Sequence, residues 1–228
     1  MKIKANKFKK IINKATISGM VIDVTLDFTE TGLKVSHRDP SSIVLSVGFI
    51  DKKEFEEYKE MKINIPTISK LLSTLNTFGE TVIEFINEEN VVILRDAESK
   101  MTLAKANVCD YHFDKEFPKV EGANLDIEKD SFDKIFKMAK EVLNVEEINF
   151  KVAGGVFTSR VTNAVDSFET TSLVEGQPEA SASLNINFIK AVMENIEGKA
   201  TLTFNNESFA VVIKADDFVY AIAKLGDD

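Results

Sequence analysis

Few residues of this 228-residue chain carry reactive side chains, and their spacing suits neither catalysis nor metal binding. The single thiol, Cys109, lies three positions before His112, and the only other imidazole is His37. A thiolate activated by an imidazole is a common nucleophile, but both residues fall in a segment without regular periodicity, which positions them poorly. None of the three residues has the spacing of a zinc site. We therefore predict an unreactive thiol, no metal, no cofactor and no enzymatic activity.

Glycines and carboxylates offer no catalytic arrangement either. Gly154-Gly155 predicts a hairpin turn rather than a phosphate-binding loop, because no Lys-Ser or Lys-Thr pair follows to open a helix. The carboxylates gather in charge runs such as 51–60, DKKEFEEYKE, which are typical of solvated surface. A lone cysteine, the lack of an apolar signal segment and the shortness of the apolar runs predict a cytoplasmic protein, in the host cytoplasm if the source is a virus.

Lysine is the remaining residue type that could have a function, because its charge can bind anions. Only Arg38, Arg95 and Arg160 among the 28 basic residues are arginines. Lysine is a point charge that suits phosphate contact, whereas the planar fork of arginine suits bidentate reading of bases. The net charge of −9 argues against nucleic-acid binding only if the charge is evenly spread, so the positions of the lysines decide the matter.

Four segments with helical periodicity position these lysines. Apolar residues recur at i, i+3, i+4 and i+7, which predicts amphipathic helices over 6–16, 68–75, 132–139 and 189–196. Ser131 is expected to cap the third helix. Each helix follows a short strand and precedes three strands separated by turn signals, so one βαβββ pattern occurs four times.

The fourfold pattern predicts an α+β fold in which helices cover one face of antiparallel sheets. Residues 107–123 fit neither period and contain Pro118 and Gly122, so we interpret them as a connector between an N-terminal domain, 1–106, and a C-terminal domain, 124–228. The halves also match in order, which indicates duplication: Phe8-x-Lys10-Ile11 recurs 124 positions later as Phe132-x-Lys134-Ile135. Each predicted domain contains two βαβββ units.

The lysines fall on the helix faces opposite the apolar stripes. A single such face is usually no more than solvated surface, and it is the repetition on equivalent helices that predicts a binding surface for phosphates without base reading. The fourth helix is the least basic, with Ala191, Glu194 and Asn195 expected outward. The predicted DNA-binding residues are Lys7, Lys9, Lys10, Lys14, Lys70, Lys134, Lys137, Lys140 and Lys190.

The whole chain resembles the sliding clamps of DNA replication, in the two-domain form of proliferating cell nuclear antigen and the smaller clamps of T-even-like phages. Beyond the four units and the connector, the resemblance rests on local matches. These are Leu26-Asp-Phe28 leading to Thr31-Gly-Leu33, Asp39-Pro-Ser-Ser42 entering a hydrophobic strand, Phe55-Glu-Glu-Tyr58, and the closing strand within 218–225.

The resemblance implies a homotrimeric ring that encircles double-stranded DNA, with the lysine-bearing helices lining the channel. It also implies that the strand at 101–106 pairs with the strand at 167–173 of a neighbouring subunit, an arrangement that would cover two open sheet edges. The implied interface residues are Met101, Leu103, Lys105, Phe168, Thr170 and Ser172.

Partners in this family insert a short hydrophobic and aromatic peptide beneath the connector. The implied partners are a DNA polymerase, a clamp loader, and other replication or repair proteins. For the connector aromatics the alternative is that they only pin the loop to the sheet. By position, the implied peptide pocket comprises Val44, Val108, Tyr111, Phe113, Phe117, Pro118, Ala223 and Leu225.

Two other functions are compatible with the sequence. One is a clamp-like processivity or checkpoint factor that is monomeric or hetero-oligomeric. The other is a non-replicative interaction scaffold or a degenerate enzyme. The sequence also leaves open whether the source is a phage, an archaeon or another replicon.

Overall fold

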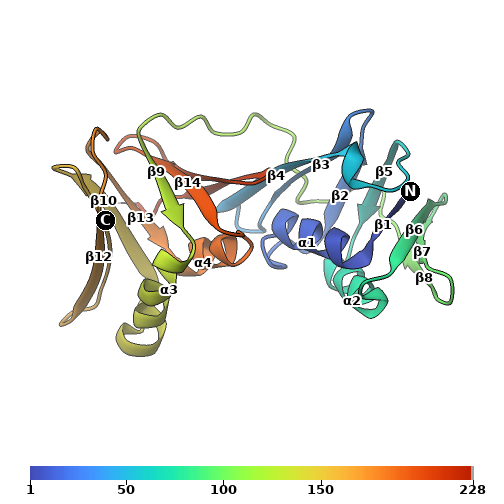
Figure 1. The fold of residues 1–228 in the computed structure, drawn as a ribbon, viewed down its shortest axis with the longest axis horizontal. Coiled ribbons are helices and arrows are strands. Elements are labelled where there is room, and N and C mark those ends of the chain that lie inside the picture. The colour runs from blue at the N-terminus through green and yellow to red at the C-terminus, as the bar shows by residue number, and fades with distance from the viewer. Residues whose placement is uncertain (227–228) are drawn as a thin grey trace. The chain divides into compact units, whose positions relative to one another are not determined.

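The order of elements in the computed structural model, which describes residues 1–226, follows the fourfold pattern of strand, helix and three strands (Figure 1). Two compact units contain them, Met1–Lys115 and Glu116–Asp228, and their boundary falls within segment 107–123. Each unit is described by itself below.

The first unit contains two helices, each preceded by one strand and followed by three. A single 3-10 turn, Lys52–Glu54, lies in the charge run that joins its two repeats. The elements are β1 Lys2–Lys4, α1 Ala5–Ala15, β2 Val24–Phe28, β3 Gly32–Arg38, β4 Val44–Asp51, β5 Met61–Ile65, α2 Ile68–Phe78, β6 Val82–Asn87, β7 Val91–Arg95 and β8 Lys100–Ala104.

The second unit repeats this order, with one addition after its first helix. That helix continues as a π-helical turn, Met138–Leu143, hereafter the π turn. The elements are β9 Ala123–Glu128, α3 Asp130–Lys137, β10 Glu147–Ala153, β11 Val156–Thr162, β12 Ser167–Leu173, β13 Ala180–Asn185, α4 Ile186–Glu194, β14 Lys199–Phe204, β15 Ala210–Ala215 and β16 Phe218–Ala223.

The first strand of each repeat pairs with the sheet of the other repeat in its unit. In the first unit the strand orders are β1-β6-β7-β8 and β5-β2-β3-β4, all antiparallel. The second unit has the orders β13-β10-β11-β12 and β9-β14-β15-β16. A βαβββ repeat is therefore a unit of sequence, while each sheet combines strands from two repeats.

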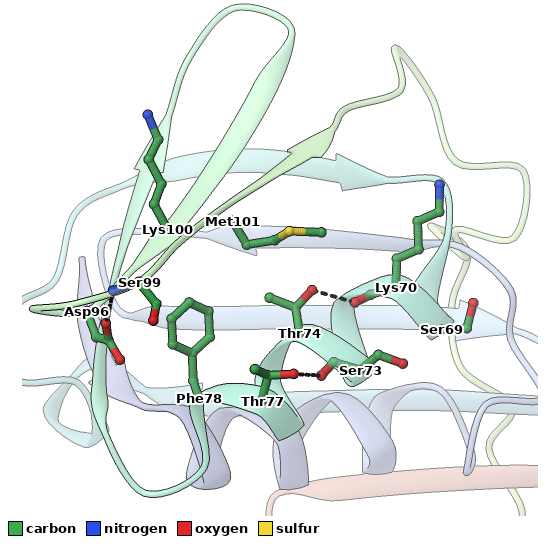
Figure 2. A pocket seen from close by; sticks show the side chains of 10 residues that line it. All are labelled: Ser69, Lys70, Ser73, Thr74, Thr77, Phe78, Asp96, Ser99, Lys100 and Met101. Atoms are coloured by element: carbon green, nitrogen blue, oxygen red, sulfur yellow. Dashed lines mark hydrogen bonds between the residues drawn. The ribbon is translucent and has the colours of Figure 1, made fainter.

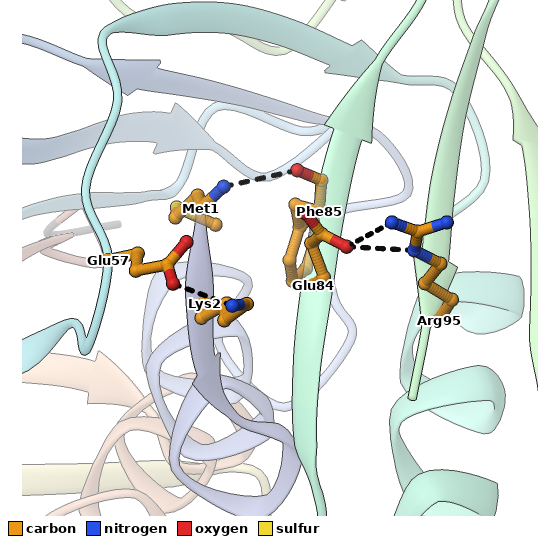
Figure 3. A network of polar contacts seen from close by, with 6 residues as sticks. All are labelled: Met1, Lys2, Glu57, Glu84, Phe85 and Arg95. Carbon is orange, nitrogen blue, oxygen red and sulfur yellow. Dashed lines mark hydrogen bonds and ion pairs between the residues drawn. The ribbon is translucent and has the colours of Figure 1, made fainter. Parts of the chain in front are cut away.

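Polar contacts surround β1 and the neighbouring strand β6 (Figure 3). Its register sets Lys2 opposite Glu84 and Ile3 opposite Ile83, and Ile3 is buried. The Lys2 ammonium lies 2.6 Å from a Glu57 carboxylate oxygen, and Glu84 accepts a contact of 2.7 Å from Arg95. Exposed ion pairs of this kind each contribute little, so burial of Ile3 and the backbone ladder hold the strand.

The apolar stripes of the helices form the core with the sheets, as their periodicity predicts. In α1 the buried residues are Ala5, Phe8, Ile11, Ile12 and Ala15, and the Phe8 ring meets Phe85 of β6 edge-on with centroids 4.8 Å apart. In the second unit, Phe150 of β10 contacts Phe132 of α3 and Phe204 of β14, at centroid distances of 5.8 and 6.2 Å.

The start and end of the third helix differ from the prediction. Ser131 is not its cap, because the helix begins at Asp130 and the Ser131 hydroxyl donates to the Glu128 carbonyl oxygen at 2.6 Å. At the other end the π turn places Ala139 and Leu143 in the core and leads to Asn144 in the left-handed region, with φ of 50°. Such turns are rare and often mark functional positions.

Replacing Phe8 tests the packing of α1. We expect Phe8→Ala to lower the free energy of unfolding by about 3–5 kcal/mol, because a fully buried ring leaves a cavity against Phe85. Phe209→Ala is the matched control, because that ring is 73% exposed and the reduction there is about 0.5 kcal/mol or less. Urea unfolding of both variants gives the measurement, and equal reductions would contradict this core.

Candidate nucleic-acid interface

The two helices of the first unit lie side by side and carry lysines but no carboxylates (Figure 1). The Lys9 ammonium donates to the Asn76 side-chain oxygen at 2.8 Å and so joins α1 to α2. Lys10 and Lys70 are exposed, and Lys7, Lys9 and Lys14 are half-buried. Because neither helix contains Asp or Glu, the pair presents a concentrated positive charge.

Lys7 has an acidic partner outside the helices. It forms an ion pair with Glu54, in the 3-10 turn after β4. The pair offsets the charge at the start of α1. We therefore expect Lys7 to contribute less to an anion-binding surface than the exposed Lys70.

The helices of the second unit carry balanced charge. One hollow lies between α4 and the segment formed by α3 and the π turn. Its lining includes three lysines, Lys137, Lys140 and Lys190, and three acidic residues, Asp133, Glu141 and Glu194. Lys137 lies 3.9 Å from Glu141 and Lys190 lies 3.8 Å from Glu194. Lys134 is exposed on α3 outside this hollow.

The imbalance between the helix pairs is larger than the sequence predicts. Only the fourth helix is expected to be weakly basic, with Ala191 outward, whereas Ala191 is buried. The signal that was missed is the pair of acidic residues Asp130 and Asp133 in the first turn of the third helix.

Strands β8 and β12 are the least buried strands of the described structure. Leu103 is the one buried residue of β8, and β12 has none. Each lies at the end of its sheet. Among residues 1–226 no backbone hydrogen bond joins the outer edge of either strand to another segment, and we call these the uncovered edges.

Other sheet ends are covered by neighbouring chain. The Ala106 amide donates to Asn64 of β5 at 2.9 Å, the Leu225 amide donates to Ser183 of β13 at 2.9 Å, and Lys2 of β1 exchanges backbone bonds with the segment at Glu56–Glu57. The cover at these three sheet ends contrasts with the uncovered edges of β8 and β12.

The predicted interface residues fall on these two strands in different environments. Met101 is 41% exposed, Phe168 and Thr170 are half-buried, and Ser172 is exposed. Two residues depart from the expectation of an exposed contact. Leu103 is 4% exposed and belongs to the core of its own unit. Lys105 lies beyond β8, and its ammonium donates to the side-chain oxygen of Asn87 at 2.7 Å.

The start of the predicted connector binds along β3. The Arg38 amide donates to the Tyr111 carbonyl oxygen and the Phe113 amide to the Ser36 carbonyl oxygen, both at 2.9 Å. Strand β2 pairs with β3 only at Asp27 and Phe28, so the connector supplies backbone partners where β2 diverges.

His37 fills the space opened by this divergence. Its Nε2 accepts a hydrogen bond of 2.9 Å from the Thr25 amide, and the ring is fully buried beside His112. Burial, with a smaller contribution from His112, lowers the pKa of His37 to about 3. Burial also raises the pKa of the nearby Asp23 carboxyl and of the buried Cys109 thiol. A raised pKa makes a thiol less reactive.

The residues of the predicted peptide pocket do not all reach the surface. Val44 is fully buried, which removes it from an exposed site, while Val108 is 73% exposed. Tyr111 and Phe113 are half-buried along β3, and Phe117, Pro118 and Ala223 are half-buried in the second unit. Leu225 is 39% exposed and lines a hollow beside β13 with Phe150 and Ser183.

A hollow that the sequence does not predict lies beside the uncovered edge of β8. It has a volume of about 480 Å³ between α2 and β8, with Phe78 and Met101 among its lining residues (Figure 2). Sequence periodicity places Met101 on a strand but does not show that space remains beside it.

Within residues 1–226 neither a membrane-spanning helix nor a metal-binding cluster is present. No helix there is long and apolar enough to cross a bilayer. No group of three or more His, Cys, Asp or Glu side chains in that range is arranged to hold a metal ion.

Comparisons with known proteins bear on this architecture. No protein-family model matches the chain. A "DNA polymerase sliding clamp" of Methanococcus vannielii is 23% identical over 212 residues, which cover 86% of this chain and 84% of that protein.

Solved structures share the fold. One is PCNA of A. fulgidus bound to the C-terminal region of FEN-1, with a TM-score of 0.84, 16% identity, and coverage of 100% of this chain and 98% of that one. Another is the PCNA2–PCNA3 complex of Sulfolobus tokodaii, with a TM-score of 0.77, 19% identity, and coverage of 98% of both chains. The predicted fold class is therefore confirmed.

The buried imidazole makes stability depend on pH. Between the ordinary pKa of 6.5 and about 3 in the fold, the unfolded chain binds a proton that folded His37 does not. Its contribution is complete above pH 6.5 and falls as the pH decreases, by about 2 kcal/mol from pH 7 to pH 5.

His37→Gln tests this dependence, because its side-chain oxygen can still accept from the Thr25 amide but does not titrate. We expect urea unfolding to show a smaller decrease of stability between pH 7 and pH 5 in the variant. Asp23 has a raised pKa and acts in the opposite direction in both proteins, so their difference isolates His37. Parallel pH profiles would refute the assignment.

Proposed function

We propose that this chain, a sliding clamp of the proliferating cell nuclear antigen type, closes as a homotrimer around duplex DNA and tethers a DNA polymerase to it. The proposed role is that of a scaffold without catalysis. The single observation that carries the ring is the pair of uncovered edges at β8 and β12, one in each unit. Antiparallel pairing of β8 with β12 of a second copy would cover both.

The lysines of α1 and α2 supply the proposed contact with DNA. Ammonium groups neutralise phosphates without reading bases, and binding of this kind weakens steeply with salt. A closed ring cannot leave the duplex sideways, so weak contacts suffice and still permit sliding. The balanced charge of α3 and α4 leads us to assign most of the phosphate contact to the first unit, at Lys9, Lys10, Lys14 and Lys70.

Partner proteins are proposed to bind through short hydrophobic peptides. The FEN-1 segment bound to the A. fulgidus protein supports this mode for a chain of the same fold. For this chain we propose Val108, Tyr111, Phe113, Phe117, Pro118, Ala223 and Leu225 as contact residues, since all are at least partly accessible. A clamp loader that opens the ring completes the proposed set of partners.

A second candidate function keeps the fold but changes the assembly. The Sulfolobus tokodaii structure contains two different chains, PCNA2 and PCNA3, which favours a hetero-oligomeric ring as the alternative. In that case β8 and β12 of this chain would pair with a different protein. Light scattering at micromolar concentration separates the two: a trimeric mass supports the homotrimer, and a monomeric mass contradicts it.

Retention on circular DNA tests encirclement. We expect the protein, once loaded on a nicked circle, to stay through gel filtration and to dissociate when the circle is cut, because a ring slides off free ends. A protein bound to the side of the duplex would stay bound after the circle is cut. Equal retention on circular and linear DNA would therefore overturn the proposal.

Charge reversal tests which helices contact phosphate. We expect Lys10→Glu with Lys70→Glu to weaken DNA binding and to reduce the slope of log K against log salt by about 0.9 for each phosphate that the protein no longer neutralises. Lys134→Glu with Lys137→Glu should have a smaller effect, because carboxylates already surround α3.

The control for total charge is Lys151→Glu with Lys214→Glu, which reverses two exposed lysines on β10 and β15. DNA titrations at several salt concentrations give the slopes. Equal slopes for the helix variants and this strand variant would show that α1 and α2 do not contact DNA.

A further inference from the structure

We infer that the hollow between α2 and β8 is a socket for a second copy of this chain, and that the π turn of that copy fills it with Val142. The inference rests on the proposed homotrimer and identifies side-chain contacts that would hold it together. The hollow is called the α2–β8 socket below.

Phe78 and Met101 give the socket an apolar part. Both residues line it, and Met101 is 41% exposed (Figure 2). The other lining residues are polar, and the hydroxyls of Thr74 and Thr77 donate to the Lys70 and Ser73 carbonyl oxygens of their own helix, at 2.7 and 3.1 Å. Because these two hydroxyls are already bonded, the part of the socket at Phe78 and Met101 suits an apolar side chain.

The π turn offers such a side chain. Val142 is 62% exposed, while its neighbours Ala139 and Leu143 are buried beneath the turn. The Leu143 carbonyl oxygen accepts from the Asn163 side chain at 3.4 Å, which fixes the turn close to the loop between β11 and β12. The turn also contacts β12 directly.

Topology brings these two features together when β8 and β12 pair. Leu103 of β8 is buried on the side of α2, so the helix covers that face of the first sheet. On β12, Phe168 and Thr170 are half-buried and alternate with exposed residues, and α3 and the π turn contact this strand. A β8–β12 ladder would continue one sheet across the joint, with α2 and the π turn as neighbours above it.

Charge favours the same occupant. Lys70 and Lys100 line the socket, and α2 contains no acidic residue. The π turn has Glu141 beside Val142, and Glu146 and Glu147 follow it. Asp96 also lines the socket, but its carboxylate accepts the Glu98 and Ser99 amides at 2.9 and 2.6 Å and is therefore held within its own turn.

Val142→Lys tests the inference by placing an ammonium group beside Phe78 and Met101 and close to Lys70 and Lys100. We expect the trimer dissociation constant to rise at least tenfold, while circular dichroism stays unchanged because Val142 is exposed in the single chain. Phe209→Lys is the matched control, an equally drastic change at a residue that is 73% exposed between β14 and β15. Sedimentation over a range of concentrations measures both constants.

Crosslinking tests the contact directly. We expect Val142→Cys combined with Ser73→Cys to form a disulfide between subunits under oxidation, giving covalent dimers and trimers on a denaturing gel. The native Cys109 is buried and contributes little background. Phe209→Cys combined with Ser73→Cys is the control and should remain monomeric on the gel.

The outcomes separate the socket from the ring. A wild-type trimer whose Val142→Lys variant keeps the same dissociation constant, with no crosslink from the paired cysteines, overturns the socket and leaves the proposed homotrimer standing. A wild-type protein that is monomeric at micromolar concentration overturns the homotrimer and the socket with it. A weakened trimer together with a specific crosslink supports both.

Discussion

Every strand at the end of a sheet leaves backbone amides and carbonyls that need partners, and this requirement governs the structure. The chain covers β5, β13 and β1 with its own segments, and residues 111–113 cover β3 where β2 leaves it. Strands β8 and β12 receive no such cover within the described residues. Pairing of these two edges with another subunit would explain three features. These are the low burial of the two strands, the hollow beside α2 and the exposed π turn.

Phosphate binding places a second constraint on the structure, which concerns the distribution of charge. An acidic chain with a net charge of −9 can still offer phosphates a positive surface if its carboxylates are kept away from it. Helices α1 and α2 approach this condition, because they contain lysines and no carboxylates of their own, although Glu54 pairs with Lys7. Helices α3 and α4 do not, since their lysines lie among Asp133, Glu141 and Glu194. The duplication visible in the sequence has thus left two helix pairs of equal shape and unequal charge.

Much of the fold could be predicted because each helix and strand is amphipathic in its own residues. Phe8, Ile11, Ile12 and Ala15 predict α1 by spacing alone, and all four are buried. The exchange of β1 and β5 between sheets depends on pairing between strands that lie far apart in the sequence. No local periodicity predicts it. The same holds for His37, whose partner is the amide of Thr25. In the candidate site the helix lysines were predictable, whereas the burial of Val44 and the α2–β8 socket depend on packing.

The exchange of first strands has a consequence for synthesis of the chain. Strand β1 forms its ladder with residues 82–84, so the first strand made has no partner strand until roughly the first third of the chain has been translated. The two repeats of a unit resemble a strand-swapped pair joined by the segment after β4, and neither repeat contains a complete sheet of its own. A ribosome-bound fragment that ended before β6 would expose both β1 and the apolar face of α1. Folding is therefore expected to proceed one whole unit at a time, and the smallest part of this protein able to fold alone is a pair of repeats.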